Sequence, residues 1–421
     1  GGGAGGGAVY LVNQSYWTIT GLEVTNDNGT NNITGSNRVG ILVNNTSGAL
    51  KSGITIQGNV VRRVNGCFVC NGADAHFNGG IAVIADPLSP LSTGASSYKD
   101  VRILDNVVDH VGRTGIIFGD WSTGLLYAVA YDALSKDITI SGNTVTNVDS
   151  DGIVIGGAKY NQIDHNVVDN AGLVTVRNSS EPSSGGIWPT KARHTTIEYN
   201  EVSRVHTQST DGQAFDVDLL ADDTTLQYNY SHDNEGGFLL LEGGGFHGSG
   251  VTARYNLSVN DAYTGAKGVV TFALGVLPNS DIYNNTIYIA PGVPAKPFMQ
   301  DGWSGTTSTA WSFRNNVVVN LGTGTWSTPT GAHAVVDHNL IHGNHTAGEP
   351  ADANKITADP QMLAPAATAP AGIGNVSGYQ LAATSPAAGS GAVIAGNGGQ
   401  DFFGRPVSAT AAPTRGFHEV N

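Results

Sequence analysis

Carboxylate side chains concentrate in one short stretch of the chain, residues 210–218. This stretch contains Asp211, Gln213, Asp216 and Asp218. Alternate residues of a β-strand point to opposite faces, so Asp216 and Asp218 are expected to project from one face with Cα atoms about 6.5 Å apart. Two carboxyl groups at such a spacing suit cleavage of a glycosidic bond, in which one protonates the leaving oxygen and the other acts as nucleophile or activates water. Crowding of like charges would raise the pKa of one carboxyl and keep its proton available.

Further polar and aromatic residues lie close by in the segment 186–242. Trp188 is expected to expose its ring beside the carboxylates, because an indole face stacks on the C–H surface of a sugar. Glu235 comes one repeat after Asp211, and we expect it about 5 Å from that carboxylate, close enough to pair as acid and base. We therefore assign catalysis to Asp211, Asp216, Asp218 and Glu235, and substrate contacts to Trp188, Lys191, Arg193, Gln213, His232 and Glu242.

Two other interpretations of these residues stay open. Asp residues are common at turns, and an acidic cluster can also hold a structural Ca²⁺. Lys191 or Arg193 could instead neutralise a uronate carboxylate during β-elimination, which is the chemistry of a polysaccharide lyase, with Ca²⁺ assisting. The hydrolase interpretation requires no cofactor, and Ca²⁺ is the candidate metal of the alternatives.

A repeated phrase indicates the elements that position these residues. It consists of an apolar residue, two variable residues, an Asn, one variable residue and usually a β-branched residue. Its Asn residues are Asn59, Asn106, Asn143, Asn166, Asn200, Asn229, Asn256, Asn285, Asn316 and Asn339. They are 23 to 47 residues apart, and a repeat of that size is typical of stacked units. The phrase alternates and is rich in Val and Ile, so each unit is strand-like.

A second strand of each repeat begins just after a Gly, as in residues 80–83, 115–118 and 152–155. Strands that repeat once per unit, with Gly-rich corners and no helical periodicity, predict an all-β right-handed parallel β-helix. The first apolar residue after each Gly should point inward and the next outward. The repeated Asn residues should stack as an internal hydrogen-bonded ladder, which keeps them out of the candidate site.

The composition limits the partners. The chain has 20 Lys and Arg against 34 Asp and Glu, a net charge of −14, which argues against nucleic acid and anionic membrane surfaces. No apolar run approaches the roughly 18–20 residues of a membrane span. Cys67 and Cys70 are expected to form a local disulfide, which fits an extracellular protein, whereas a zinc site would have only Asp74 and His76 to add.

The chain is expected to have a β-helix domain over residues 1–346 and a tail over residues 347–421. It opens directly on a coil strand at residues 8–12, so we expect an N-terminal cap to be missing. The tail is rich in Ala, Pro, Gly and Ser, and we expect it to pack on or cap the last coils. We expect a monomer.

The Asn phrase and the Gly-led strands resemble those of bacterial right-handed parallel β-helix proteins of carbohydrate metabolism, over roughly residues 8–345. That group includes pectate-lyase-like lyases and glycoside hydrolases such as β-helix lacto-N-biosidases, β-xylosidases and α-fucosidases. The ending, residues 385–387, 401–406 and 416–419, is similar to the close of such secreted proteins. The resemblance implies two carboxylates on the exposed sheet, either Asp211 with Asp218 or Asp218 with Glu242.

The sequence therefore predicts a secreted bacterial glycoside hydrolase that acts on a complex oligo- or polysaccharide. The pattern of polygalacturonases, neighbouring Asp pairs followed by Gly-His-Gly and Arg-Ile-Lys, is not found in the sequence, which lowers the case for pectin hydrolysis. The first alternative is a polysaccharide lyase that uses Lys191 or Arg193. The second is a non-enzymatic glycan-binding or adhesion module. The polar cluster in residues 186–242 argues against it.

Overall fold

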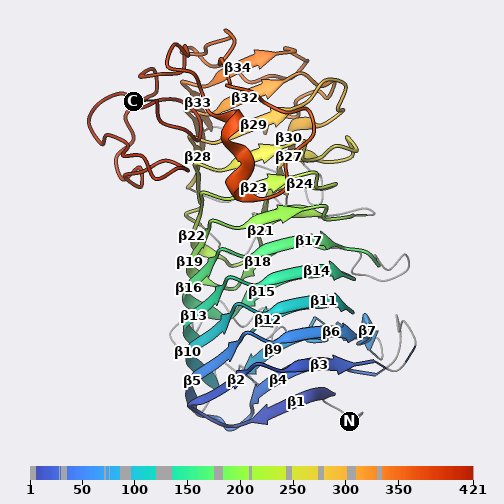
Figure 1. The fold of residues 1–421 in the computed structure, drawn as a ribbon. Helices are drawn as coiled ribbons and strands as arrows, with labels where there is room; N and C mark the ends of the chain where they lie inside the picture. The colour runs from blue at the N-terminus through green and yellow to red at the C-terminus, as the bar shows by residue number, and fades with distance from the viewer. Residues whose placement is uncertain are drawn as a thin grey trace. The chain divides into compact units, whose positions relative to one another are not determined.

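The structure is a computed structural model. It describes residues 6–27, 29, 36–70, 73, 74, 76–85, 96–119, 135–174, 184–207, 211–242, 249–273, 279–300, 310–329 and 334–420. Contacts divide the chain into two compact units, the first formed by residues 1–196 and 204–222 and the second by residues 197–203 and 223–421. Figure 1 shows the strands of each unit as a ribbon. The tail belongs to the second unit by this division, and whether it is a domain of its own stays a prediction.

Apart from the short antiparallel pair β7 (Val69–Cys70) and β8 (Ala73–Asp74), the described strands of the first unit form three parallel sheets, here named A, B and C. Sheet A contains, in spatial order, β1 (Gly7–Val12), β4 (Val39–Asn45), β9 (Gly79–Ala85), β12 (Thr114–Phe118), β15 (Asp151–Gly156), β18 (Ile187–Thr190) and β21 (Gln213–Val217). Sheet B contains β2 (Trp17–Thr20), β5 (Leu50–Gln57), β10 (Ser97–Leu104), β13 (Ser135–Ser141) and β16 (Ala158–Asp164). Sheet C contains β3 (Glu23–Asn26), β6 (Val60–Val64), β11 (Val107–Val111), β14 (Thr144–Val148) and β17 (Val167–Ala171). The chain contributes one strand to sheet A, one to sheet B and one to sheet C in succession. Each such set of three strands is one coil of a parallel β-helix.

The second unit has the same three-sheet pattern. One sheet contains β24 (Gly237–Glu242), β27 (Gly268–Ala273) and β30 (Lys296–Gln300), and another β25 (Thr252–Arg254), β28 (Ser280–Tyr283), β31 (Trp311–Arg314) and β33 (Ala334–Asp337). The third contains β20 (Glu201–Ser203), β23 (Tyr230–His232), β26 (Leu257–Val259), β29 (Thr286–Ile289), β32 (Val317–Asn320) and β34 (Leu340–Gly343). Two strands, β19 (Arg193–Glu198) and β22 (Asp222–Gln227), have residues in both units. The fold prediction is confirmed.

The repeated Asn residues stack as predicted. In the first unit the backbone N–H and the Nδ2 group of Asn106 both donate to Oδ1 of Asn143, each at 2.9 Å. Asn59 bonds Asn106 in the same way, and Asn143 bonds Asn166. The residue before each Asn has a positive φ, as at Asp105 with φ 52°, and this left-handed residue makes the tight corner between sheets B and C.

The ladder of the second unit runs from Asn200 to Asn339 and ends on the tail. The backbone N–H and Nδ2 of Asn339 donate to Oδ2 of Asp352, at 2.8 and 3.0 Å. A carboxylate can accept both bonds at once, so Asp352 satisfies the donors that a further Asn would otherwise receive.

The glycines at the start of sheet A strands are required by close approach. A Cβ added to Gly115 would lie 2.4 Å from a methyl group of Val145 and 2.6 Å from the carbonyl oxygen of Gly152. Gly80 and Gly152 meet equivalent obstacles on their neighbouring coils. Real Cβ atoms do not tolerate such contacts, so the sequence Gly-Ile marks the place where sheets A and C come together.

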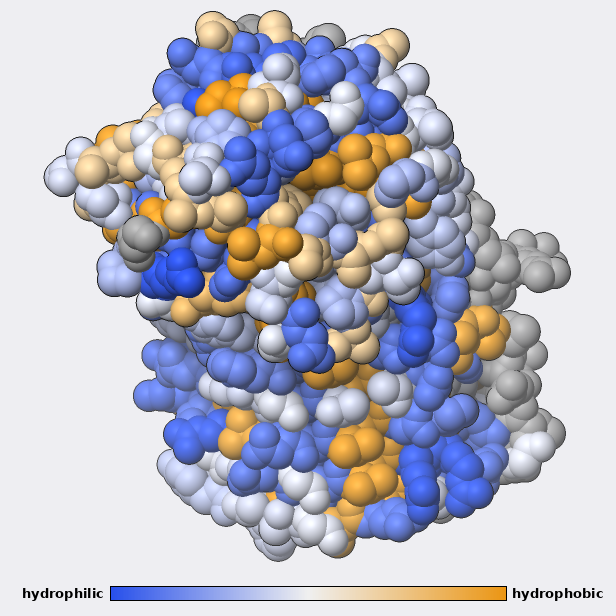
Figure 2. Space-filling model, turned by 45° about the horizontal axis from the view of Figure 1, so that its top comes forward, coloured by the Kyte–Doolittle hydropathy of each residue, from blue (hydrophilic) through white to orange (hydrophobic). Residues whose placement is uncertain are grey.

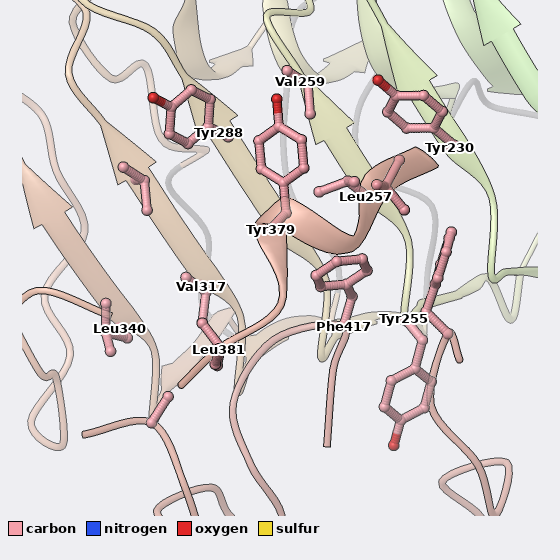
Figure 3. Packing of buried hydrophobic residues seen from close by; sticks show 14 of the residues in the cluster. Tyr230, Tyr255, Leu257, Val259, Tyr288, Val317, Leu340, Tyr379, Leu381 and Phe417 are labelled. Atoms are coloured by element: carbon pink, nitrogen blue, oxygen red, sulfur yellow. The ribbon is translucent and has the colours of Figure 1, made fainter. Parts of the chain in front are cut away.

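The tail packs on the second unit through aromatic residues and hydrogen bonds. Tyr379, at the end of the 3₁₀-helix η3 (Ile373–Tyr379), lies beside Tyr288 with ring centroids 5.4 Å apart (Figure 3). The hydroxyl of Tyr230 donates to the carbonyl of Pro370 at 2.8 Å, and Phe417 is fully buried in the same cluster (Figure 3). The tail therefore completes a core that the strands alone would leave open.

Cys67 is disulfide-bonded, as the sequence predicts. Within the described ranges, no helix has the length and apolarity to cross a membrane. Hydrophilic side chains cover much of the surface in Figure 2, with hydrophobic ones gathered in narrower strips and patches.

Candidate functional site

The outer face of sheet A carries an apolar row that ends in a carboxylate. Strand pairing aligns Leu42, Ala82, Ile117, Val154 and Trp188 on successive coils. These residues form a buried cluster separate from the interior of the coils. On the next strand Phe215 pairs with Ile187, so Asp216 takes the place that follows Trp188 in the row.

Asp216 is buried, with 8% of its surface exposed. Its Oδ1 atom has no hydrogen-bond partner in the part of the chain that the structure describes. Burial, followed by the charges of Asp218, Asp211 and Asp151, raises the pKa of the Asp216 carboxyl well above its usual range. The physical cause is that a buried anion loses its hydration and faces other anions, so the neutral acid is favoured.

Asp211 and Asp218 are both half-buried and lie at the two ends of this strand segment. Asp211 has a left-handed backbone with φ 47°, and it precedes Gly212, which donates its N–H to the carbonyl of Ser184 at 2.6 Å. Asp218 follows β21, and its Oδ1 accepts the N–H of Leu219 at 2.5 Å. The structure thus brings three of the predicted catalytic carboxylates of the first unit into one electrostatically coupled group, Asp211, Asp216 and Asp218.

Gln213 begins β21, the strand that also carries Asp216. Its side chain is 1% exposed, and its Oε1 has no described hydrogen-bond partner. The hydroxyl of Thr114, on β12 of the same sheet, is likewise buried without a partner. A buried amide and a buried hydroxyl without partners are unusual, because an unmade hydrogen bond costs about 1–3 kcal/mol.

Trp188 departs from the prediction, because its ring is buried rather than exposed. Only 7% of the residue is accessible, and its Nε1 donates to Oδ1 of Asp151 at 3.2 Å. The ring also meets His76 edge-on, with centroids 5.9 Å apart. Strand alternation predicted the correct side of the sheet for Trp188 but could not show that this side is itself covered.

A buried charged network around Asp151 is the part of the site that the sequence did not reveal. Nη1 of Arg113 lies 3.1 Å from Oδ2 of Asp151, and both residues are at most 2% exposed. Nη2 of Arg113 is 3.0 Å from Nδ1 of His76, and the N–H of Gly185 donates to Oδ1 of Asp151 at 3.1 Å. Asp151 precedes a Gly just as Asp211 does, and this repeated Asp-Gly pair was the available signal.

Two basic residues of the prediction lie just after β18. Arg193 begins β19, and its Nε is 3.1 Å from Oδ2 of Asp222. Lys191 occupies the bend before it with φ 50°, and its backbone N–H donates to the carbonyl of Leu219 at 2.9 Å. Arg193 is therefore engaged in an ion pair of its own.

Three predicted residues lie in the second unit, and their pairing with Asp211 or Asp218 stays a prediction. Glu235 is half-buried, and its Oε1 accepts the hydroxyl of Tyr263 at 3.1 Å. Glu242 ends β24 and is 7% exposed. His232 lies on β23, buried between the carboxylates of Glu201 and Asp233 at 3.3 and 3.0 Å.

Metal binding has no geometric support in the described residues. Among them, no three His, Cys, Asp or Glu side chains are grouped so that they could hold an ion. A role for Ca²⁺ therefore stays a prediction.

Comparison with known proteins supports the fold. The family model described as "Right handed beta helix region" matches residues 91–287, which confirms the right-handed parallel β-helix. No curated protein matches the sequence significantly. The native and selenomethionine structures of GH136 lacto-N-biosidase from Eubacterium ramulus are similar, with 21% and 20% identity and TM-scores of 0.56 and 0.54.

Those two similarities cover 78% of this chain and 51% and 50% of the lacto-N-biosidase. The chain thus spans about half the length of that protein. Pectate lyase Pel9A shares 14% identity over 91% of this chain and 88% of its own, with a TM-score of 0.45. At such identities the likeness concerns the fold alone.

Proposed function

We propose that the chain is a secreted glycoside hydrolase that cleaves a complex oligo- or polysaccharide at the acidic cluster of Asp211, Asp216 and Asp218. One observation carries the proposal, the buried Asp216 carboxyl whose pKa is raised by burial and by the charges of its neighbours. A carboxyl group whose pKa is raised, next to other carboxylates, is suited to donate a proton to a glycosidic oxygen. The similarity to a lacto-N-biosidase in fold adds support.

The reaction needs one proton and one electron-rich oxygen. A protonated carboxyl transfers its proton to the glycosidic oxygen while the bond from that oxygen to the anomeric carbon breaks. An ionised carboxylate attacks the anomeric carbon or removes a proton from an attacking water. Asp211 and Asp218 are half-buried and Asp216 is buried, so we assign the substrate contacts to Asp211 and Asp218. Asp216 passes its proton to one of these two, which donates it to the glycosidic oxygen, while the other acts as nucleophile or base.

The first alternative, a lyase, has less support. A lyase must neutralise a uronate carboxylate with a cation, and Arg193 already pairs with Asp222 at 3.1 Å. The second alternative, a non-enzymatic glycan-binding or adhesion module, gains nothing from a buried acid whose charged form destabilises the fold. The disulfide at Cys67 favours secretion, because such bonds persist in oxidising compartments.

A glycan panel tests the proposal. Wild type and the variants Asp211→Asn, Asp216→Asn and Asp218→Asn should be assayed for new reducing ends and for the ultraviolet absorbance of an unsaturated lyase product. We expect reducing ends without that absorbance, and a fall in turnover of about 10²–10⁴ in the Asp211 and Asp218 variants. Asp137→Asn, an exposed residue of β13 with φ 59°, is the matched control and should keep wild-type turnover. Near wild-type turnover in all three variants on a confirmed substrate would show the assignment to be wrong.

A further inference from the structure

A cavity of about 660 Å³ lies in the first unit at the corner where sheet C strands end and the chain turns toward sheet A. Residues near the ends of β6, β11 and β14 line it, together with residues of two other coils. The lining residues are Asp27, Gly29, Arg63, Val64, Asn65, His110, Val111, Gly112, Asn147, Asp149, Leu173 and Val174. A volume of this size is in the range of small-molecule sites.

The cavity is built by the coil repeat. Val64 pairs with Val111, and Val111 pairs with Val148, so the residues that precede them, Arg63, His110 and Asn147, are stacked on successive coils. All three have left-handed backbones, with φ values of 53°, 52° and 54°. The corner therefore presents one polar side chain per coil at a regular spacing of about 4.8 Å.

Two charged groups in the cavity have no partner among the residues that the structure describes. The guanidinium of Arg63 and the carboxylate of Asp149 form no hydrogen bond or ion pair with any described residue. Arg63 is exposed, and Asp149 is half-buried. Burial raises the pKa of Asp149 to about 6, although the charge of His110 lowers it. An acceptor that is partly desolvated and unpaired is available to a ligand that donates hydrogen bonds.

The remaining lining residues indicate the class of ligand. Leu173 and Val174 add aliphatic surface, and Asn65 and Asn147 add carboxamides. The lining carries both signs of charge, with the carboxylates of Asp27 and Asp149 and the guanidinium of Arg63. A ligand with many hydroxyl groups, C–H faces and no net charge fits such a lining better than an ion does.

We propose that this cavity is a second glycan-binding site, in which Arg63 and Asp149 hold neutral sugar rings of the oligo- or polysaccharide away from the acidic cluster. The site rests on the proposed carbohydrate function and adds a substrate class to it, neutral rather than uronate sugars. Asp149 lies two residues before Asp151 in the chain, so this corner leads directly into the strand that carries the buried network.

Binding can be separated from catalysis. The double variant Arg63→Gln/Asp149→Asn should be titrated calorimetrically with neutral xylo-, gluco-, galacto- and N-acetylhexosamine-containing oligosaccharides and with a uronate oligosaccharide. We expect wild type to bind a neutral member and the double variant to bind it about tenfold or more weakly, because two charge-assisted hydrogen bonds are lost. For a cleaved polymer, KM should rise while kcat on a short aryl glycoside stays unchanged.

Arg62→Gln is the matched control, because Arg62 is the neighbour of Arg63 on β6 but pairs with Glu23 and does not line the cavity. It should bind as wild type. Unchanged binding by the double variant, tighter binding of the uronate, or no binding of any oligosaccharide would each overturn the second site. The hydrolase assignment fails separately, if binding depends on the cavity residues but no glycan is cleaved.

Discussion

His232 is expected to clamp the tail rather than hold a sugar. Its imidazole lies 3.3 Å from Oε1 of Glu201 and 3.0 Å from Oδ2 of Asp233, and 7% of its side chain is exposed. Glu201 in turn accepts the backbone N–H groups of Gly372 and Ile373, each at 2.7 Å. A charged His232 therefore stabilises the carboxylate that holds the tail in place.

The magnitude follows from the pKa of the imidazole. Burial lowers it, but hydrogen bonds to Asp233 and Glu201 and the charges of Asp233 and Asp261 outweigh burial and raise the pKa of His232 from 6.5 to about 9. At about 1.4 kcal/mol per pKa unit, the difference corresponds to about 3 kcal/mol of stability. Because the folded-state pKa is the higher one, this stability is fully present below about pH 6.5 and is lost as the pH rises through about 9.

The assay compares His232→Gln with wild type by chemical denaturation from pH 6 to pH 10, and by hydrogen exchange in residues 366–381. We expect the variant to be less stable by about 3 kcal/mol at pH 6, with the difference shrinking toward pH 10, and the amides of Gly372 and Ile373 to exchange faster. His345→Gln is the control, since its imidazole is exposed and its pair with Glu349 at 2.9 Å should contribute less than about 1 kcal/mol. Weakened glycan binding with unchanged stability and exchange would refute the clamp.

Three further predictions concern the candidate site and the ladder. Asp216→Asn should raise the melting temperature at pH 7 while lowering turnover. The raised pKa of the Asp216 carboxyl means that the folded state loses stability as the pH rises through that pKa, whereas an amide cannot ionise. A lower melting temperature would contradict this. Trp188→Phe should cost about 1–3 kcal/mol in thermal denaturation, since the ring is buried and Asp151 loses a donor; an unchanged melting temperature would speak against it. Asn256→Ala should cost about 2–5 kcal/mol of unfolding free energy, because the buried side chain donates to Leu226 and Asn285; a loss below 1 kcal/mol would be inconsistent with the ladder.

The sequence predicted the fold because its strongest constraints are local and repeated. The Asn of each phrase forms hydrogen bonds with the Asn of the next coil, as Asn106 does with Asn143. Because every coil requires the same residue type for the same hydrogen bonds, the repeat can be recognised in the sequence alone. The close contact of Gly115 with Val145 is repeated on neighbouring coils for the same reason. Stacking makes every coil subject to the same steric and hydrogen-bonding demands, so the pattern persists while the rest of the sequence varies.

The site was predictable only in part, because its environment depends on residues far apart in the chain. The carboxylates Asp216 and Asp218 could be found from strand alternation. The pairing of Arg113 with Asp151, 38 residues apart, could not. Burial of Trp188 was missed for a related reason, since alternation assigns a side chain to a face and says nothing about what covers that face.

The site proposed for catalysis lies on β21, where buried polar side chains lack a hydrogen-bond partner among the described residues. Single buried polar atoms without a partner occur elsewhere in the described chain, as at Tyr98. On β21 two of them, Gln213 and Asp216, lie three residues apart, and burial raises the pKa of the Asp216 carboxyl. Each such group costs about 1–3 kcal/mol if nothing binds it. A substrate with hydroxyl groups would supply the missing hydrogen-bond partners. Burial of the Asp216 carboxyl would then lower the stability of the free protein and favour catalysis.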